Sequence, residues 1–144
     1  MFVCDVTDAD ATRAAIDQIA ADLGQIDVLV NNAGLGRFDP VDEQTEADWG
    51  LQVDTNLSGV FHCTRAAVPH MKAQGSGRII NISSGRIWEG NPNRLDYTTS
   101  KAGVIGLTRA LAIELAREQV GVLEAAIASA RDGVFLADGY NDSP

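Results

Sequence analysis

The stretch IDVLVNNAG, residues 26–34, decides the fold class, because an apolar run passes directly into polar residues and a glycine. A short apolar run bounded by turn-forming residues is typical of a strand buried on both faces of a parallel sheet. In such sheets ligands bind beyond the carboxyl ends of the strands. We therefore expect Asn32, Ala33 and Gly34 to lie at the functional edge of the sheet.

Strands and helices alternate along the rest of the chain. Two further apolar runs end in polar residues and predict strands, MFVCDV at 1–6 and GRIINISS at 77–84. Apolar residues at helical spacing predict three helices, over 7–24, 46–74 and 98–117. This alternation favours an α/β fold built from right-handed βαβ units, with a Rossmann-like parallel sheet and flanking helices.

Threonine–aspartate pairs mark the starts of two of these helices. Thr7 with Asp10, and Thr45 with Asp48, have the spacing of a capping box, in which the threonine hydroxyl accepts a hydrogen bond from a free backbone N–H. Gly24 is expected to end the first helix, since glycine adopts the left-handed conformation that terminates many helices.

Composition excludes several classes of protein. The 144 residues, 45% hydrophobic and 22% charged, have the length and composition of one folded domain. A net charge of −9 would repel a phosphate backbone, so we expect no nucleic-acid partner. No apolar run approaches the roughly 20 residues that span a bilayer, so we expect a cytoplasmic protein with no membrane partner. The two histidines and two cysteines lack ligand spacing, and we expect no metal site.

A serine, a tyrosine and a lysine stand close together in SSGRIWEGNPNRLDYTTSKAG, residues 83–103. Tyr97 and Lys101 have the i, i+4 spacing that places both on one helix face, and a nearby cation lowers the pKa of a tyrosine toward the range useful for proton transfer. The alternative is a tyrosine at a helix start and a solvated lysine, and the pair alone does not decide. Ser84 either donates to a substrate carbonyl or forms a turn. Asn56, a poor helix former, suggests a buried structural or water-binding residue.

Together these residues resemble the short-chain dehydrogenase/reductase family. The NNAG sequence resembles the dehydrogenase/reductase branch rather than the sugar epimerase branch that shares the YxxxK spacing. The match covers residues 1 to about 118 without insertions and keeps the family's order: Asp5-Val6 after a strand, NNAG at 31–34, Asn56, Ser84 and Tyr97-x-x-x-Lys101.

The resemblance implies an NAD(P)-dependent oxidoreductase that interconverts a small carbonyl compound and an alcohol by hydride transfer. Tyr97 would be the acid/base, and Lys101 would lower its pKa and hold the nicotinamide ribose. Ser84 would polarise the carbonyl, while Asn56 would hold a water in the proton relay. The resemblance further implies pairing of copies through helices 46–74 and 98–117. The residues implied on the adenosine side of NAD or NADP are Asp5, Val6, Asn32, Ala33 and Gly34.

Two features of that family are not found in these 144 residues. One is the glycine-rich TGxxxGxG turn that binds the cofactor phosphates at a helix N-terminus. The other is a VxVNxxxPG strand, where this chain has Leu123, Ile127 and Ala128 in place of Asn, Pro and Gly. We therefore expect a partial domain over 1–118 and a divergent tail over 119–144.

The fold is accordingly expected to be incomplete, with the first two βα units and the last strand missing. MFVCDV should then either leave the sheet or slide beside IDVLV as a substitute parallel strand. These residues alone are expected to bind a dinucleotide weakly and to turn over little. The alternative function is a catalytically inactive fragment that binds a full-length relative.

Overall fold

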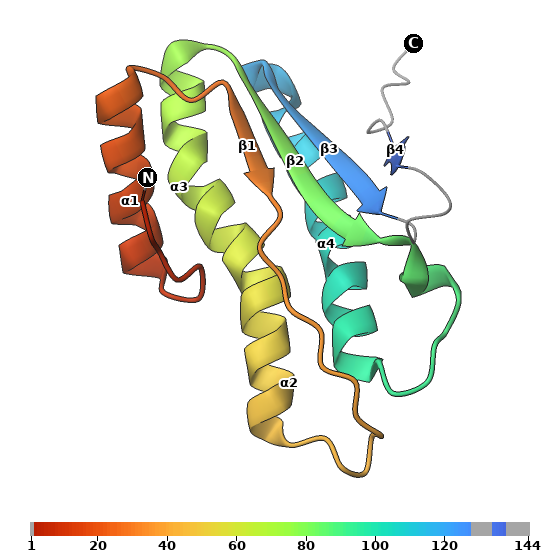
Figure 1. Ribbon diagram of the computed structural model, residues 1–144. Helices are drawn as coiled ribbons and strands as arrows, with labels where there is room; N and C mark the ends of the chain where they lie inside the picture. The colour runs from red at the N-terminus through yellow and green to blue at the C-terminus, as the bar shows by residue number, and fades with distance from the viewer. Residues whose placement is uncertain (1, 128–133, 138–144) are drawn as a thin grey trace.

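The computed structural model describes residues 2–127 and 134–137 (Figure 1). Its sheet has the strand order β1-β2-β3-β4. The strands β1 (Val28–Asn31), β2 (Gly77–Ser84) and β3 (Val120–Ile127) are parallel, and β4 (Val134–Ala137) runs antiparallel to β3. The parallel part confirms the predicted partial Rossmann-like α/β fold.

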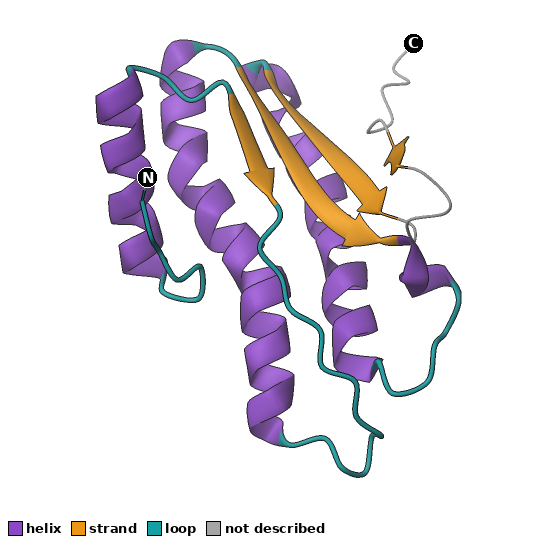
Figure 2. Cartoon of the chain, in the orientation of Figure 1, coloured by secondary structure: helices purple, strands orange, loops and turns teal. Residues whose placement is uncertain are grey.

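Among the described residues, α3 and α4 pack directly against the sheet, and α1 packs against α3 (Figure 2). The helices predicted over 46–74 and 98–117 are both present, although the first contains a π-helical turn at Asp54–Ser58 between α2 and α3. Short 3₁₀ turns follow β2 at Gly85–Trp88 and α4 at Ala116–Glu118. The α-helices span Ala9–Leu23 (α1), Glu46–Val53 (α2), Gly59–Gln74 (α3) and Leu95–Leu115 (α4).

The core lies between the sheet, α1, α3 and α4. Burial alternates along β2, as expected of a sheet with one covered face. None of the described helices combines the length and apolar character that a bilayer span needs. The residues that form the core cluster are Ile16, Ala66, Ala67, Met71, Ile79, Leu115, Val120 and Val122.

The prediction of a strand at MFVCDV is wrong for residues 2–6, which form no strand and leave Val3 94% exposed. The sliding alternative is wrong as well, because residues 2–6 form no strand and β1 stands at the edge of the described sheet. The segment instead runs beside α1 and α3, where the Val6 carbonyl lies 2.9 Å from Nδ1 of His62. A strand needs a neighbouring strand for its backbone groups, and residues 2–6 have none in the described sheet.

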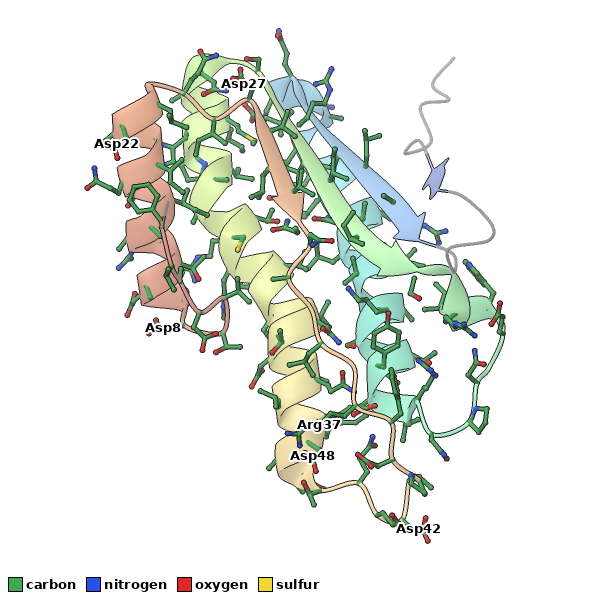
Figure 3. The ribbon with its side chains drawn as sticks, viewed as in Figure 1. Asp8, Asp22, Asp27, Arg37, Asp42 and Asp48 are labelled. Carbon is green, nitrogen blue, oxygen red and sulfur yellow. The ribbon has the colours of Figure 1, made fainter. Side chains whose placement is uncertain are left out.

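The helix ends follow the sequence signals with one correction. Asp8, and not Thr7, caps α1, since its carboxylate accepts hydrogen bonds from the backbone N–H groups of Asp10 and Ala11 at 3.0 and 2.9 Å (Figure 3). The Thr7 hydroxyl instead donates to the Asp5 carboxylate at 2.8 Å. The cap at Gly24, with φ of 83°, is confirmed.

The cap of α2 is also confirmed, because Oγ1 of Thr45 accepts from the Asp48 backbone N–H at 3.1 Å. The Asp48 carboxylate additionally pairs with Arg37 from the loop after β1, beside which it lies in Figure 3. This start of α2 is therefore tied to the loop that leads away from the NNAG segment.

The described part of residues 119–144, which the sequence predicted to be a divergent tail, contains β3 and β4. Val120 and Val122 of β3 are both buried and join the core, and β3 pairs along the whole length of β2. No strand was predicted for Val134–Ala137, which forms β4. Ala128, one of the departures from the family pattern, lies outside the described residues.

Glu124 is a buried carboxylate on β3, 9% exposed, and burial raises its pKa above the ordinary 4.5 while Arg109 opposes that shift. A raised folded-state pKa contributes stability that is complete below the unfolded pKa and is lost as the pH rises through the folded one. Glu124→Gln should therefore be more stable than the original protein at pH 7, with the gain vanishing near pH 4. Urea unfolding at both pH values measures this.

The matched control is Glu114→Gln, because Glu114 is exposed on α4. Its effect on the free energy of unfolding should be small and equal at the two pH values. An equal gain for Glu124→Gln at both pH values would contradict the assignment of a buried, proton-binding carboxylate.

Candidate active site

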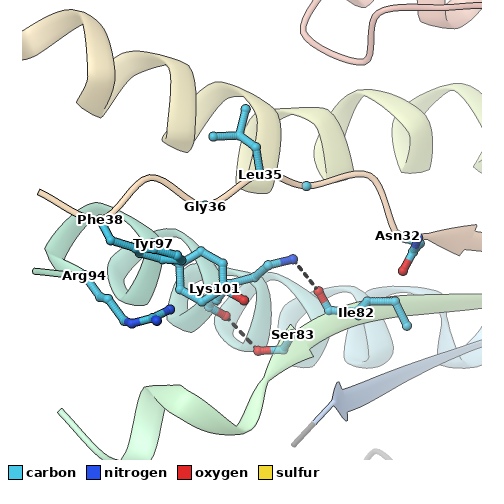
Figure 4. Close-up of a pocket in the computed structure, with 10 residues that line it drawn as sticks. Asn32, Leu35, Gly36, Phe38, Ile82, Ser83, Arg94, Tyr97 and Lys101 are labelled. Atoms are coloured by element: carbon cyan, nitrogen blue, oxygen red, sulfur yellow. Dashed lines mark hydrogen bonds between the residues drawn. The ribbon is translucent and has the colours of Figure 1, made fainter. Parts of the chain in front are cut away.

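A cavity of about 400 Å³ lies beyond the carboxyl ends of β1 and β2, where the sequence predicted the functional edge (Figure 4). Three segments form its wall: the loop after β1, the end of β2 and the first turns of α4. Its lining residues are Asn32, Gly34, Leu35, Gly36, Phe38, Ile82, Ser83, Arg94, Tyr97 and Lys101.

Tyr97 and Lys101 reach this cavity from successive turns of α4, as their spacing predicted. Lys101 is only 5% exposed, and its Nζ donates to the Ile82 carbonyl oxygen at 2.9 Å. Burial lowers the pKa of Lys101 because desolvation disfavours the ammonium. Lys101 is therefore fixed by its hydrogen bond to Ile82, and it lines the same cavity as the Tyr97 ring.

Of the two serines that end β2, Ser83 lines the cavity and Ser84 does not. Ser83 donates to the Lys101 carbonyl oxygen at 2.9 Å and so fixes α4 against β2. Ser84 is buried, and its hydroxyl accepts from the Arg86 backbone N–H at 3.3 Å. A hydroxyl that accepts one hydrogen bond still has a proton to donate, so the role implied for Ser84 stays a prediction.

Asn56 is fully buried in the π-helical turn and ties the loop after β1 to the helices. Its Oδ1 accepts from the Leu35 N–H at 2.8 Å, and its Nδ2 donates to the Leu35 carbonyl oxygen at 2.9 Å. The same Nδ2 lies 3.2 Å from Oγ of Ser100 on α4. This confirms the buried Asn, while its water-binding role stays a prediction.

A chain of buried polar side chains holds the two strand ends in register below the cavity. Asn31 donates to Oδ1 of Asn81 at 2.8 Å and to Oγ1 of Thr64 on α3 at 3.1 Å. Asn81 in turn donates to Oγ1 of Thr108 on α4 at 2.9 Å. Buried polar groups that are mutually satisfied fix one arrangement of their elements, here β1, β2 and both helices.

Gly34 allows the loop to pass close to two site residues. A Cβ at this position would lie 3.0 Å from Oδ1 of Asn56 and 3.3 Å from Nζ of Lys101. We expect Gly34→Ala to destabilise the protein by about 1–2 kcal/mol, because both tightly bonded side chains must shift. Thermal unfolding, followed by circular dichroism, measures this loss.

Gly50→Ala is the matched control, since a Cβ there meets nothing within 4 Å and Gly50 lies inside α2. It should stabilise the protein by about 0.5–1 kcal/mol through helix propensity. Equal shifts for both alanine variants would show that the crowding at Gly34 has no energetic consequence.

The remaining predicted cofactor residues do not line the cavity. Asp5 accepts from the backbone N–H and the hydroxyl of Thr7, and these hydrogen bonds lower the pKa of its carboxyl. Val6 packs beside Gly59, where an added Cβ would lie 2.7 Å from its side chain. Ala33 follows Asn32 in the loop after β1. The adenosine-side roles of these residues stay predictions.

Phe38 and Arg94 line the cavity, and neither was named individually as a site residue from the sequence. The Arg94 guanidinium carbon lies 3.6 Å from the centre of the Phe38 ring, and that ring meets Tyr97 edge to face with centres 6.0 Å apart. Neither residue belongs to a motif, and only the fold brings the loop after β1 beside the start of α4.

Comparison with known proteins gives matches over most of the chain. The family model described as short chain dehydrogenase matches residues 1–130. The 3-oxoacyl-(acyl-carrier-protein) reductase FabG of Staphylococcus aureus is 46% identical over 117 residues, which are 81% of this chain and 48% of that protein.

Solved structures give the same result. A xylitol dehydrogenase bound to NAD+ superposes with a TM-score of 0.85 at 37% identity, over 88% of this chain and 49% of that one. A gluconate 5-dehydrogenase from Burkholderia cenocepacia, in complex with NADP and tartrate, gives 0.83 at 38% identity, over 86% and 49%. The chain thus spans about half the length of the proteins it matches.

Proposed function

The chain belongs to the short-chain dehydrogenase family, and from that premise we propose that it is an NAD(P)-dependent oxidoreductase that interconverts a carbonyl and an alcohol. The observation that carries the proposal is the cavity shared by Tyr97, Lys101, Asn32 and Gly34. Hydride transfer between a carbonyl and an alcohol needs a proton donor and room for a ligand. Tyr97 is the proton donor, Lys101 is a buried cation beside it, and Gly34 leaves room for a ligand at the carboxyl ends of the parallel strands.

The cavity suits the nicotinamide end of a dinucleotide. A side chain at position 34 would crowd Lys101, and Gly34 leaves that space open, so the Lys101 ammonium can bond ribose hydroxyls. When bound, NAD or NADP supplies or accepts the hydride. The superposed structures that hold NAD+ and NADP support either cofactor. For the adenosine side we propose Asp5, Val6, Asn32, Ala33 and Gly34.

Tyr97 is the proposed acid/base of this reaction. In the reductive direction its hydroxyl gives a proton to the substrate oxygen, and in the oxidative direction the phenolate takes one from the alcohol. The Lys101 ammonium stabilises the phenolate by its charge. We propose that Ser84 donates to the same substrate oxygen and that Asn56 holds a water of the proton relay.

A second candidate function is a non-catalytic fragment that binds a full-length relative. Two observations favour it: Val28 and Val30 on β1 are each 52% exposed, and Phe61 on α3 and Ile113 on α4 are 49% and 82% exposed. Unpaired strand edges and exposed apolar helix faces are surfaces that other chains cover. Pairing of copies through 46–74 and 98–117 is proposed on the same ground.

One experiment separates the two candidates. The purified chain is incubated with millimolar NADH or NADPH and a panel of small ketones and keto acids, and the products are detected by mass spectrometry. Slow alcohol formation by the original protein, lost in Tyr97→Phe, supports the oxidoreductase. No product, together with co-purification of a full-length relative, supports the fragment.

A further inference from the structure

We propose that the substrate carries a carboxylate, and that Arg94 binds this group while the carbonyl faces Tyr97. The inference rests on the oxidoreductase proposed above and names its substrate class. It makes Arg94 a specificity-determining residue and Phe38 the residue that positions it.

The charged side chains that line the cavity are positive. Among the residues that the structure describes, the lining contains two cations, Arg94 and Lys101, and no aspartate or glutamate. Lys101 already donates to the Ile82 carbonyl oxygen and lies deep in the wall. Arg94 therefore supplies the cation that a ligand can approach.

Arg94 is also free of any carboxylate partner in the part of the chain that the structure describes. Three other arginines, Arg13, Arg37 and Arg86, each pair with an acidic side chain within 4.0 Å, whereas Arg94 is in no such pair. An arginine presents several N–H donors in a planar fork that matches a carboxylate. That donor capacity is left for a ligand.

Phe38 fixes the direction in which this fork points. The guanidinium stacks on the ring at 3.6 Å, so the ring covers one face and the N–H groups project sideways in the plane. The Phe38 ring also contacts the Tyr97 ring. Figure 4 shows Arg94 and Lys101 on either side of the Tyr97 ring. The proposed substrate places its carboxylate at Arg94 and its carbonyl at Tyr97, two residues that line the same cavity.

A second cavity, of about 490 Å³, borders Arg94 on its other side and is lined by Asp39 and Asp42. Neither carboxylate comes within 4.0 Å of a basic group among the described residues. Their negative charge disfavours an anion in this second cavity. A bound carboxylate should thus take the Tyr97 side of Arg94.

The test compares levulinate, a keto acid, with its neutral methyl ester, which keeps the same ketone. Dissociation constants are measured by ligand-observed NMR without cofactor, and KM and kcat with millimolar NADPH or NADH. The variants are Arg94→Gln, Arg94→Lys and the control Arg13→Gln, whose residue is exposed on α1. We expect the original protein to prefer levulinate, and Arg94→Gln to weaken levulinate binding about tenfold or more without changing ester binding.

Arg94→Lys should retain part of the preference, and Arg13→Gln all of it. Levulinate binding that depends on Arg94 without any turnover would support the carboxylate site and count against the proposed reaction. Turnover with the same levulinate KM and dissociation constant in Arg94→Gln would overturn the carboxylate site and leave the reaction standing. Equal affinity of the original protein for levulinate and its ester, or no binding of either, also overturns it.

Discussion

Replacing Tyr97 by phenylalanine is expected to lower kcat by at least about 100-fold, because a positioned proton donor contributes that much or more to such reactions. The change removes one oxygen and keeps the ring that packs against Phe38. Folding should therefore be unaffected. The measurement is the steady-state rate of NAD(P)H oxidation at millimolar cofactor, with circular dichroism to verify the fold.

The control for this variant is Thr99→Val, which removes a hydroxyl from an exposed position on the same turn of α4. Its rate should stay within a factor of about two, since surface substitutions of this kind have small effects. A Tyr97→Phe protein that retains the rate of the Thr99→Val protein would show that the proton comes from another group.

Replacing Asn56 by alanine is expected to lower the free energy of unfolding by about 3 kcal/mol. The side chain is fully buried, and its amide both accepts from and donates to the backbone of Leu35. Each lost bond to a buried group costs roughly 1 kcal/mol, and the removed atoms leave a cavity that adds to the loss. Urea unfolding monitored by tryptophan fluorescence gives the value.

Asn91→Ala serves as the comparison, because Asn91 makes one exposed hydrogen bond, 3.2 Å long, to Glu89. That variant should change the free energy of unfolding by less than about 0.5 kcal/mol. If Asn56→Ala were equally mild, the amide would not be what holds the loop after β1 to the π-helical turn.

The parts of the fold that the sequence predicted correctly are those whose signal is local. GRIINISS has the composition of a strand and forms one, and the i, i+4 spacing of Tyr97 and Lys101 places both in one cavity wall. MFVCDV has the same kind of apolar pattern, yet a strand also requires a partner, and residues 2–6 have none in this sheet. Pattern alone carries no information about that partner.

The candidate site shows the same division. Ser83 and Ser84 are adjacent within β2 and therefore point to opposite faces of the sheet, and only the packing of the sheet decides which of them lines the cavity. Phe38 and Arg94 are distant in sequence and meet through folding of the loop after β1 onto α4. No spacing rule identifies such a pair before the fold is known.

The most direct measurement follows deuterium from the cofactor to the product. The purified protein is incubated with levulinate and NADPH or NADH deuterated at the transferred position, and the product is analysed by mass spectrometry and NMR. We expect an alcohol with one deuterium on the former carbonyl carbon, formed at least about 100-fold more slowly by Tyr97→Phe. Unchanged ketone at high protein concentration, or equal labelling by both proteins, would contradict the proposed role of this cavity.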